Sequence, residues 1–242
     1  MKIMTESLTD LLISKGADLV GFGDLTALPP NVRQNLPVGV CVAVKYPRDV
    51  VIGIYDMPPR EYYEQYDAIN DQLDDLVTTG ELFLKEHGYS AIAQTRDFVA
   101  KNITHYTSLL PHKTVATRAG LGWIGKSALL VTPEFGSALR ISSILTDAPL
   151  TVSVPYDLSL CGDCTACEDA CPAKAIKGQL WDTSTPRDQI FDPAACRKDA
   201  RRRAQRFGME RMQCGKCMEI CPHTQQYTHE AIPRTPKGAC AP

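Results

Sequence analysis

The chain has 242 residues, 44% of them hydrophobic, and a formal net charge of −2. This length and composition suit an ordinary folded core of one large domain or two small ones, without a membrane span. The charge gives no general attraction to nucleic acid or anionic lipid. The N-terminus lacks the apolar run of a signal peptide, so ten cysteines indicate a reducing cytoplasm and metal binding rather than disulfides.

The first fifty-five residues predict one helix and three strands. Residues 7–15 carry an amphipathic helical face, and residues 17–23 have the composition of a strand. Residues 38–46 form a continuous β-branched run, as expected for a strand buried on both faces. Residues 50–55 are apolar and predict a further strand beside it. Cys41, within the buried run, is interpreted as a small hydrophobe.

Residues 60–86 give the longest helix prediction. Apolar and tyrosine side chains recur there at spacings of three and four, with acidic residues between them. We interpret Tyr62 and Tyr66 as core residues rather than ligand contacts. Residues 89–94 and 137–147 read as two more strands. The N-terminal part of the chain is therefore expected to combine a sheet with covering helices.

A glycine-rich stretch occupies residues 118–131. It satisfies the P-loop pattern, but the preceding residues look helical and the following ones look like a strand and turn. A P-loop follows a strand and opens a helix, so we interpret this match as accidental. Two interpretations stay open. The glycines close a helix, or they let the backbone approach a flat cofactor.

A cysteine motif follows at Cys161, Cys164, Cys167 and Cys171, with Pro172 after it. This C-x2-C-x2-C-x3-C-P run is typical of bacterial ferredoxins, where three of its thiolates hold one [4Fe–4S] cluster and the fourth holds another. Three thiolates two residues apart can surround one cubane within a short loop. The helix that follows carries the fourth sulfur to a second cubane.

A second, shorter motif completes the ligand set. Cys214, Cys217 and Cys221 repeat the C-x2-C-x3-C-P ending, and Cys196 upstream replaces the missing first cysteine. A zinc ribbon or a disulfide framework is the alternative, but neither favours two copies of C-x3-C-P. We therefore predict one cluster held by Cys161, Cys164, Cys167 and Cys221, and a second held by Cys171, Cys196, Cys214 and Cys217.

A basic segment lies between the two motifs. Such a run is most often a solvated helix face. It can also raise the potential of a negatively charged cluster, or provide a docking face for an acidic electron donor. The residues are Arg197, Lys198, Arg201, Arg202, Arg203 and Arg206.

Several of these motifs together resemble the epoxyqueuosine reductase family and, more loosely, the reductive dehalogenases. The stretches that carry the resemblance are AGLGWIGK (119–126), GSALRISSILTDAPL (136–150), CGDCTACEDACPAKAI (161–176), DPAAC (192–196) and CGKCMEICPH (214–223). The resemblance implies an α+β fold. A nitroreductase-like scaffold would occupy residues 1–150, a two-cluster ferredoxin-like module residues 151–232, and a tail residues 233–242.

The resemblance also implies a function. The chain would be an iron–sulfur oxidoreductase that takes electrons from a low-potential donor such as a ferredoxin or flavodoxin. Two [4Fe–4S] clusters would pass them to a small-molecule substrate or to cobalamin, which carries out the difficult chemistry. The corrinoid would be lined by the loop residues Gly120, Gly122, Trp123, Gly125 and Lys126.

Two departures from the family stand against a simple transfer of its activity. Epoxyqueuosine reductases carry an acidic proton donor shortly before AGLGWIGK, whereas residues 101–117 contain no Asp or Glu. Tyr106 or His105 could act as the general acid, although packing is the simpler interpretation of both. The chain also stops after the second motif, so with its near-neutral charge we do not expect a tRNA substrate. An electron carrier without its own substrate and a tRNA epoxyqueuosine reductase stay open as alternatives.

Overall fold

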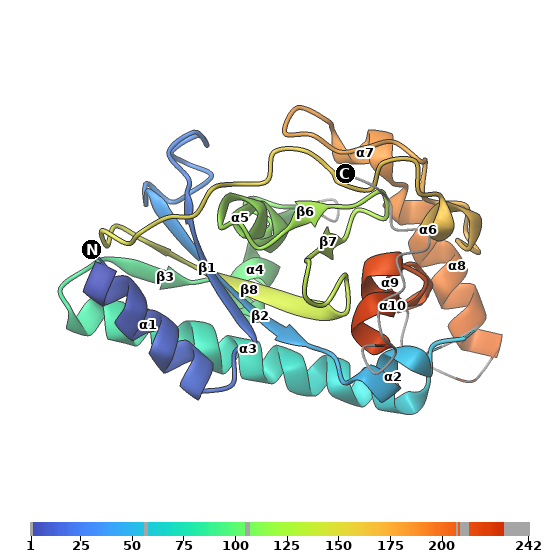
Figure 1. Cartoon of the computed structure of the whole chain (residues 1–242), viewed down its shortest axis with the longest axis horizontal. Helices are drawn as coiled ribbons and strands as arrows, with labels where there is room; N and C mark the ends of the chain where they lie inside the picture. The colour runs from blue at the N-terminus through green and yellow to red at the C-terminus, as the bar shows by residue number, and fades with distance from the viewer. Residues whose placement is uncertain (1, 56–57, 105–106, 207, 209–212, 230–242) are drawn as a thin grey trace. The chain divides into compact units, whose positions relative to one another are not determined.

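The computed structural model describes residues 2–55, 58–104, 107–206, 208 and 213–229 (Figure 1). The chain divides into two compact units, each built from separate stretches of sequence. The first unit comprises residues 1–45, 67–122 and 139–156, and the second comprises residues 46–66, 123–138 and 157–242. Within the described residues, no helix is both long and apolar enough to cross a bilayer.

The first unit is organised around a four-stranded antiparallel sheet of order β1-β2-β8-β3. Its central pair is β2 and β8, which are matched from Val38↔Thr146 to Lys45↔Leu139. All six interior residues of β2 are buried, which confirms the prediction of a strand covered on both faces. The strands are β1 (Leu19–Asp24), β2 (Val38–Lys45), β3 (Ala91–Ala93) and β8 (Leu139–Thr146).

Helices cover both faces of this sheet (Figure 1). On one face, α1 (Lys2–Ser14) and α3 (Arg60–Glu86) meet at Gly80, where an added Cβ would clash with Ile144 of β8. On the other face, α5 (His112–Arg118) packs over β1, β2 and β8. The α3 bounds confirm the helix predicted over residues 60–86, and buried Tyr62 confirms its role in the core.

The strand predicted over residues 50–55 is wrong, because this segment contains the short helix α2 (Arg48–Ile52). Pro47 precedes the helix, and its fixed φ suits a helix start. Val50 and Val51 are buried on the helix, and α2 packs against α10 (Pro222–Thr228) in the second unit. A short apolar run fits a buried strand and a buried helix turn equally well.

A short hairpin follows α4 (Arg96–Lys101) in the first unit. It is formed by β4 (Ile103–Thr104) and β5 (Thr107–Ser108). The candidate general acids His105 and Tyr106 fall between these strands and lie outside the described residues.

The second unit contains one small hairpin and mostly short helices. The hairpin pairs β6 (Trp123–Ile124) with β7 (Leu130–Val131). Two of the helices, α6 (Ala166–Asp169) and α9 (Lys216–Glu219), contact each other, and each contains the first cysteine of a C-x3-C-P motif. The repeated sequence therefore produces a repeated local structure. The remaining helices are α7 (Arg187–Ile190) and α8 (Pro193–Arg206).

Candidate metal centre

Four cysteine thiols gather in a first group within the second unit. Burial raises the pKa of Cys167 to about 12, and the neighbouring thiolates of Cys221, Cys161 and Cys164 raise it further. Burial also raises the pKa of Cys221, again with Cys161 and Cys164 as its charged neighbours. The structure thus brings together three thiols of the first motif and the last thiol of the second.

The other four thiols form a second group. Burial raises the pKa of Cys196 to about 11, and the neighbouring thiolates of Cys214 and Cys171 raise it further. Burial raises the pKa of Cys217, with Cys214 and Cys196 as its strongest charged neighbours. Cys167 of the first group also acts on Cys217, so the two groups are adjacent.

Local backbone structure explains how short sequence segments present these sulfurs. Gly162 has a φ of +49° and Gly215 a φ of +71°, so the first C-x2-C loop of each motif turns sharply at a glycine in the left-handed region. The Ala175 amide donates to Cys171 Sγ over 3.3 Å. Backbone amides after Pro222 also hydrogen-bond to Cys221 and lower its pKa, although burial outweighs them. Such N–H···S bonds are among the features that set cluster potentials.

Both groups fit a [4Fe–4S] cluster by the chemistry of their donors. Buried thiolates side by side raise one another's pKa, and iron supplies the positive charge that lets all four ionise. The nine described cysteines are all free, including Cys41, whose pKa burial raises. Among the described residues, no three His, Cys, Asp or Glu side chains converge as ligands of a single ion do.

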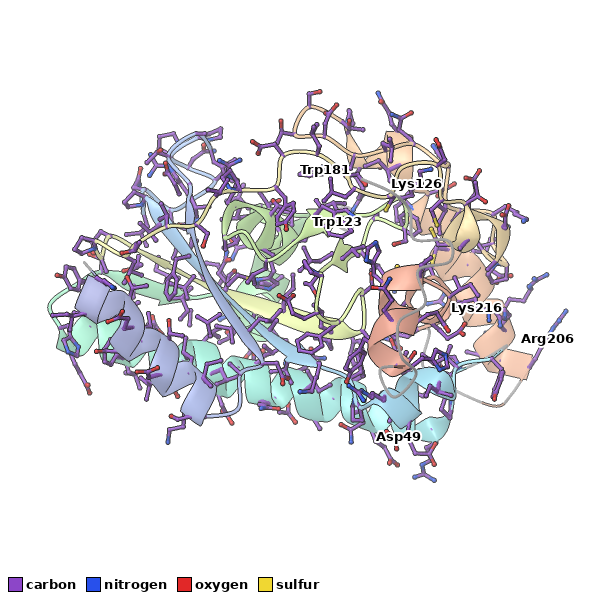
Figure 2. The ribbon with its side chains drawn as sticks, viewed as in Figure 1. Asp49, Trp123, Lys126, Trp181, Arg206 and Lys216 are labelled. Carbon is purple, nitrogen blue, oxygen red and sulfur yellow. The ribbon has the colours of Figure 1, made fainter. Side chains whose placement is uncertain are left out.

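The end of the glycine-rich loop lies against the first group. A pocket in the second unit is lined by Gly125, Lys126 and Ser127 together with cysteines of both groups. Lys126 is only 6% exposed, and its Nζ donates to the Cys164 carbonyl over 3.0 Å (Figure 2). A Cβ at Gly125 would lie 2.9 Å from Val131 Cγ2 and 3.4 Å from Cys161 Sγ. This close approach of the loop to the thiols leaves no room for a side chain and explains why residue 125 is a glycine.

The loop is not a nucleotide-binding P-loop. Lys126 and Ser127 form a turn that leads into β7, whereas a P-loop opens a helix. The interpretation of the P-loop match as accidental is therefore confirmed. At the start of the loop, Gly120 ends α5 with a φ of +68°, and its Cβ position lies 2.8 Å from the Val154 carbonyl oxygen. Gly122 is buried.

One residue at the centre, His223, was not singled out from the sequence, and Arg203 was predicted only as one member of the basic run. Arg203 on α8 donates from Nη1 to Cys214 Sγ over 3.3 Å. His223 lines the pocket and meets the Trp123 ring edge-on at 5.0 Å. Its buried Nε2 has no hydrogen-bond partner among the described residues. The spacing of seven residues between Cys196 and Arg203 was the available signal for the arginine. The available signal for His223 was its position directly after Cys221 and Pro222.

A further histidine, His112, lies in the first unit at the start of α5. Its Nδ1 is 2.8 Å from Ser143 Oγ, which in turn donates to Gln94 Oε1 over 2.5 Å. Burial and, second, the positive charge of Arg140 lower the pKa of His112 to about 4. His112 is thus a half-buried, hydrogen-bonded residue whose neutral form is favoured.

Comparisons with known proteins agree with this centre. Residues 160–224 match the family model described as a 4Fe-4S double cluster binding domain. The epoxyqueuosine reductase of Synechococcus sp. (strain CC9605) is 37% identical over 125 residues, which cover 51% of this chain. The matched segment spans 37% of that relative's own length, which is little more than a third.

Solved structures show the fold. The catabolic reductive dehalogenase NpRdhA, in complex with 3-bromo-4-hydroxybenzoic acid, superposes with a TM-score of 0.71 at 20% identity. That match covers 93% of this chain and 32% of the dehalogenase. Epoxyqueuosine reductase with a tRNA-Tyr epoxyqueuosine-modified tRNA stem loop superposes with a TM-score of 0.60 at 21% identity, over 92% of this chain and 66% of that one. The chain thus carries a double [4Fe–4S]-binding domain, has an α+β fold shared with reductive dehalogenases, and is similar in sequence to epoxyqueuosine reductases.

Proposed function

We propose that this chain is an iron–sulfur oxidoreductase of the epoxyqueuosine reductase type. It would pass electrons one at a time from a ferredoxin- or flavodoxin-like donor, through two [4Fe–4S] clusters, to a reducible substrate. The observation that carries this proposal is the gathering of eight thiols into two adjacent groups of four.

The protein's own residues would hold the clusters and keep them close together. Cys161, Cys164, Cys167 and Cys221 would hold the first cluster, and Cys171, Cys196, Cys214 and Cys217 the second. Cys167 and Cys217, one from each group, line the same pocket, which gives a short path between the groups. Lys126 fixes the loop around the first group by its bond to Cys164, while Arg203 places a positive charge on the second.

The first candidate substrate is epoxyqueuosine in tRNA. We correct the expectation against tRNA, because the sequence relatives are epoxyqueuosine reductases and one solved neighbour carries a modified tRNA stem loop. The expectation rested on a net charge of −2, which does not describe how charge is distributed over the surface. Reduction of the epoxide would consume two electrons and two protons and release one water molecule.

Cobalamin is proposed from the sequence resemblance and from the fold shared with a reductive dehalogenase whose structure suggests a mechanism for B12-dependent dehalogenation. The described residues do not favour it. Trp123, Gly125 and Lys126 are buried by the chain itself, and the Lys126 amine is engaged with the Cys164 carbonyl. We therefore assign no reaction step to a corrinoid. The nitroreductase-like nature of the scaffold and the domain boundaries at residues 150 and 232 are part of the same proposal.

The second candidate is an electron carrier without a substrate of its own. It is favoured by the lack of any acidic residue over residues 101–117 and by the hydrogen bond that engages His112 with Ser143. In this case the centre would be unchanged, but no proton donor would be needed.

One anaerobic experiment separates these candidates. The reconstituted protein, with its iron and sulfide quantified, is given an epoxyqueuosine-modified tRNA stem loop and a photoreduced deazaflavin, with and without cobalamin. Formation of queuosine, measured by mass spectrometry, supports the reductase. Reduction of both clusters without any product under either condition contradicts it and favours the carrier. Fewer than about eight irons per chain would contradict the two-cluster centre itself.

A further inference from the structure

We propose that the exposed face of α8 is the docking surface for an acidic one-electron carrier protein. Electrons would then enter at the cluster held by Cys171, Cys196, Cys214 and Cys217. This inference rests on the proposed function, because it needs that cluster as the electron acceptor.

The exposed face of α8 is strongly basic. Six of the fourteen residues of α8 are Lys or Arg, and its one acidic residue, Asp199, pairs with Arg202 over 2.6 Å. At about 100° per residue, the exposed basic residues cover roughly half of the helix circumference. Arg206 projects outward from the C-terminal end of the helix (Figure 2). The exposed basic residues are Arg197, Lys198, Arg201, Arg202 and Arg206.

The opposite face of α8 carries ligands and contacts of the second cluster. Cys196 and Arg203 are seven residues apart and so lie on the same side of the helix. Cys196 neighbours Cys214, and Arg203 donates to the Cys214 sulfur over 3.3 Å. Ala200 and Ala204 are buried on this inner side, and their small size allows the helix to pack closely. The basic face is therefore about one helix diameter, roughly 10 Å, from the second thiol group.

This arrangement fits a protein electron donor better than a nucleic acid. An electron entry point needs a cluster directly beneath the docking surface, whereas a phosphate-binding surface does not. Carrier complexes are small and short-lived, so they depend on charge complementarity to find the correct face quickly. In the transfer itself, the reduced carrier loses one electron and the cluster gains one. No bond is formed or broken, and no proton moves.

Charge reversal on α8 tests the proposal. Lys198→Glu combined with Arg206→Glu changes the net charge by the same amount as Lys2→Glu combined with Lys15→Glu, and all four side chains are exposed. The probe is a reduced acidic [2Fe–2S] ferredoxin, mixed anaerobically with oxidised, reconstituted protein in a stopped-flow instrument. At low salt, we expect the α8 variant to react at least about tenfold more slowly than wild type, and the control within about twofold of it. High salt should remove the difference.

Other outcomes would overturn the proposal. Equal rates for the two variants, in proteins that both hold two clusters, would overturn the docking surface while leaving the proposed function intact. If the α8 variant lost affinity for the tRNA stem loop but kept the wild-type ferredoxin rate, the face would be a nucleic-acid surface instead. A wild-type protein without two clusters, judged by iron content and by electron paramagnetic resonance after photoreduction, would overturn the proposed function and the docking surface together.

Discussion

Arg203 donates a hydrogen bond from its guanidinium to the sulfur of Cys214 over 3.3 Å. The side chain comes from the same face of α8 as Cys196, so a single helix supplies both a thiol and a charged donor to the second group. Hydrogen bonds and positive charge at a ligand sulfur stabilise the reduced, more negative cluster. The two groups therefore differ in electrostatic environment, although their sequence motifs are alike.

Replacing Arg203 should lower the reduction potential of the second cluster. Arg203→Gln removes the positive charge, whereas Arg203→Lys keeps it but loses the planar guanidinium geometry. We expect a clear negative shift in the glutamine variant, a smaller one in the lysine variant, and no shift of the first cluster. A redox titration followed by electron paramagnetic resonance measures this. Arg202→Gln, on the exposed side of α8, is the matched control, and a shift of equal size there would contradict a specific role for Arg203.

Lys126 should stabilise the loop that holds the first cluster. Lys126→Met keeps most of the side-chain volume of this buried residue but leaves the Cys164 carbonyl without its donor, at a cost of about 1–3 kcal/mol. We expect faster loss of the first cluster to a chelator and a lower unfolding midpoint. Lys174→Met is the control, because Lys174 also donates to a carbonyl, that of Asp169 over 3.1 Å, but is exposed. Similar chelation rates in the two variants would show that burial of Lys126 is irrelevant.

Protonation of His112 should make the first unit less stable at mildly acidic pH than at neutral pH. Its pKa is lowered from 6.5 to about 4 in the folded protein, mainly by burial. The unfolded chain therefore binds more protons between these pH values, so this contribution is fully present above pH 6.5 and is lost as the pH falls toward 4. Between pH 6.5 and 5 the loss is roughly 2 kcal/mol.

Hydrogen exchange of the β2 and β8 amides measures this effect, since opening of the sheet reports the stability of the first unit. Protection in the wild type should decrease toward pH 5, after correction for the intrinsic exchange rate. His112→Gln should reduce that pH dependence, and His87→Gln, at an exposed position, should leave it unchanged. An unchanged pH profile in His112→Gln would show that another group is responsible.

Much of this architecture is encoded locally and was therefore predictable. The period of apolar residues predicted α3 with its observed bounds, and the β-branched run over residues 38–46 predicted β2. The strand predicted over residues 50–55 was wrong because a short apolar run carries no periodicity that separates a strand from one helical turn. The thiol groups could be proposed because the cysteine spacing itself reflects the cluster geometry.

Contacts between distant segments were not predictable in the same way. Lys126 and Cys164 are 38 residues apart, and nothing in either local sequence indicates their hydrogen bond. The basic run on α8 was visible, but only helix geometry and the fold distinguish inward-facing Arg203 from its exposed neighbours. Side-chain partners of this kind depend on the tertiary fold, which brings distant segments of the chain together.

Cys196 is the ligand with the weakest support from spacing. Cys196→Ala should reduce the iron content from about eight to about four per chain, because only the second cluster would be lost. Cys41→Ala is the control, since Cys41 is fully buried between β1 and β8 in the first unit. It should keep its iron and lose only some stability. Retention of about eight irons by Cys196→Ala would exclude this residue as a ligand.

The crossed pairing of the two motifs is the central claim, and the iron content of one double variant tests it most directly. In the crossed arrangement Cys171 and Cys214 serve the same cluster, so Cys171→Ala combined with Cys214→Ala should still hold about four irons per chain. If each motif instead served its own cluster, the same double variant would damage both and hold almost none. A value near four supports the account, and a value near zero contradicts it.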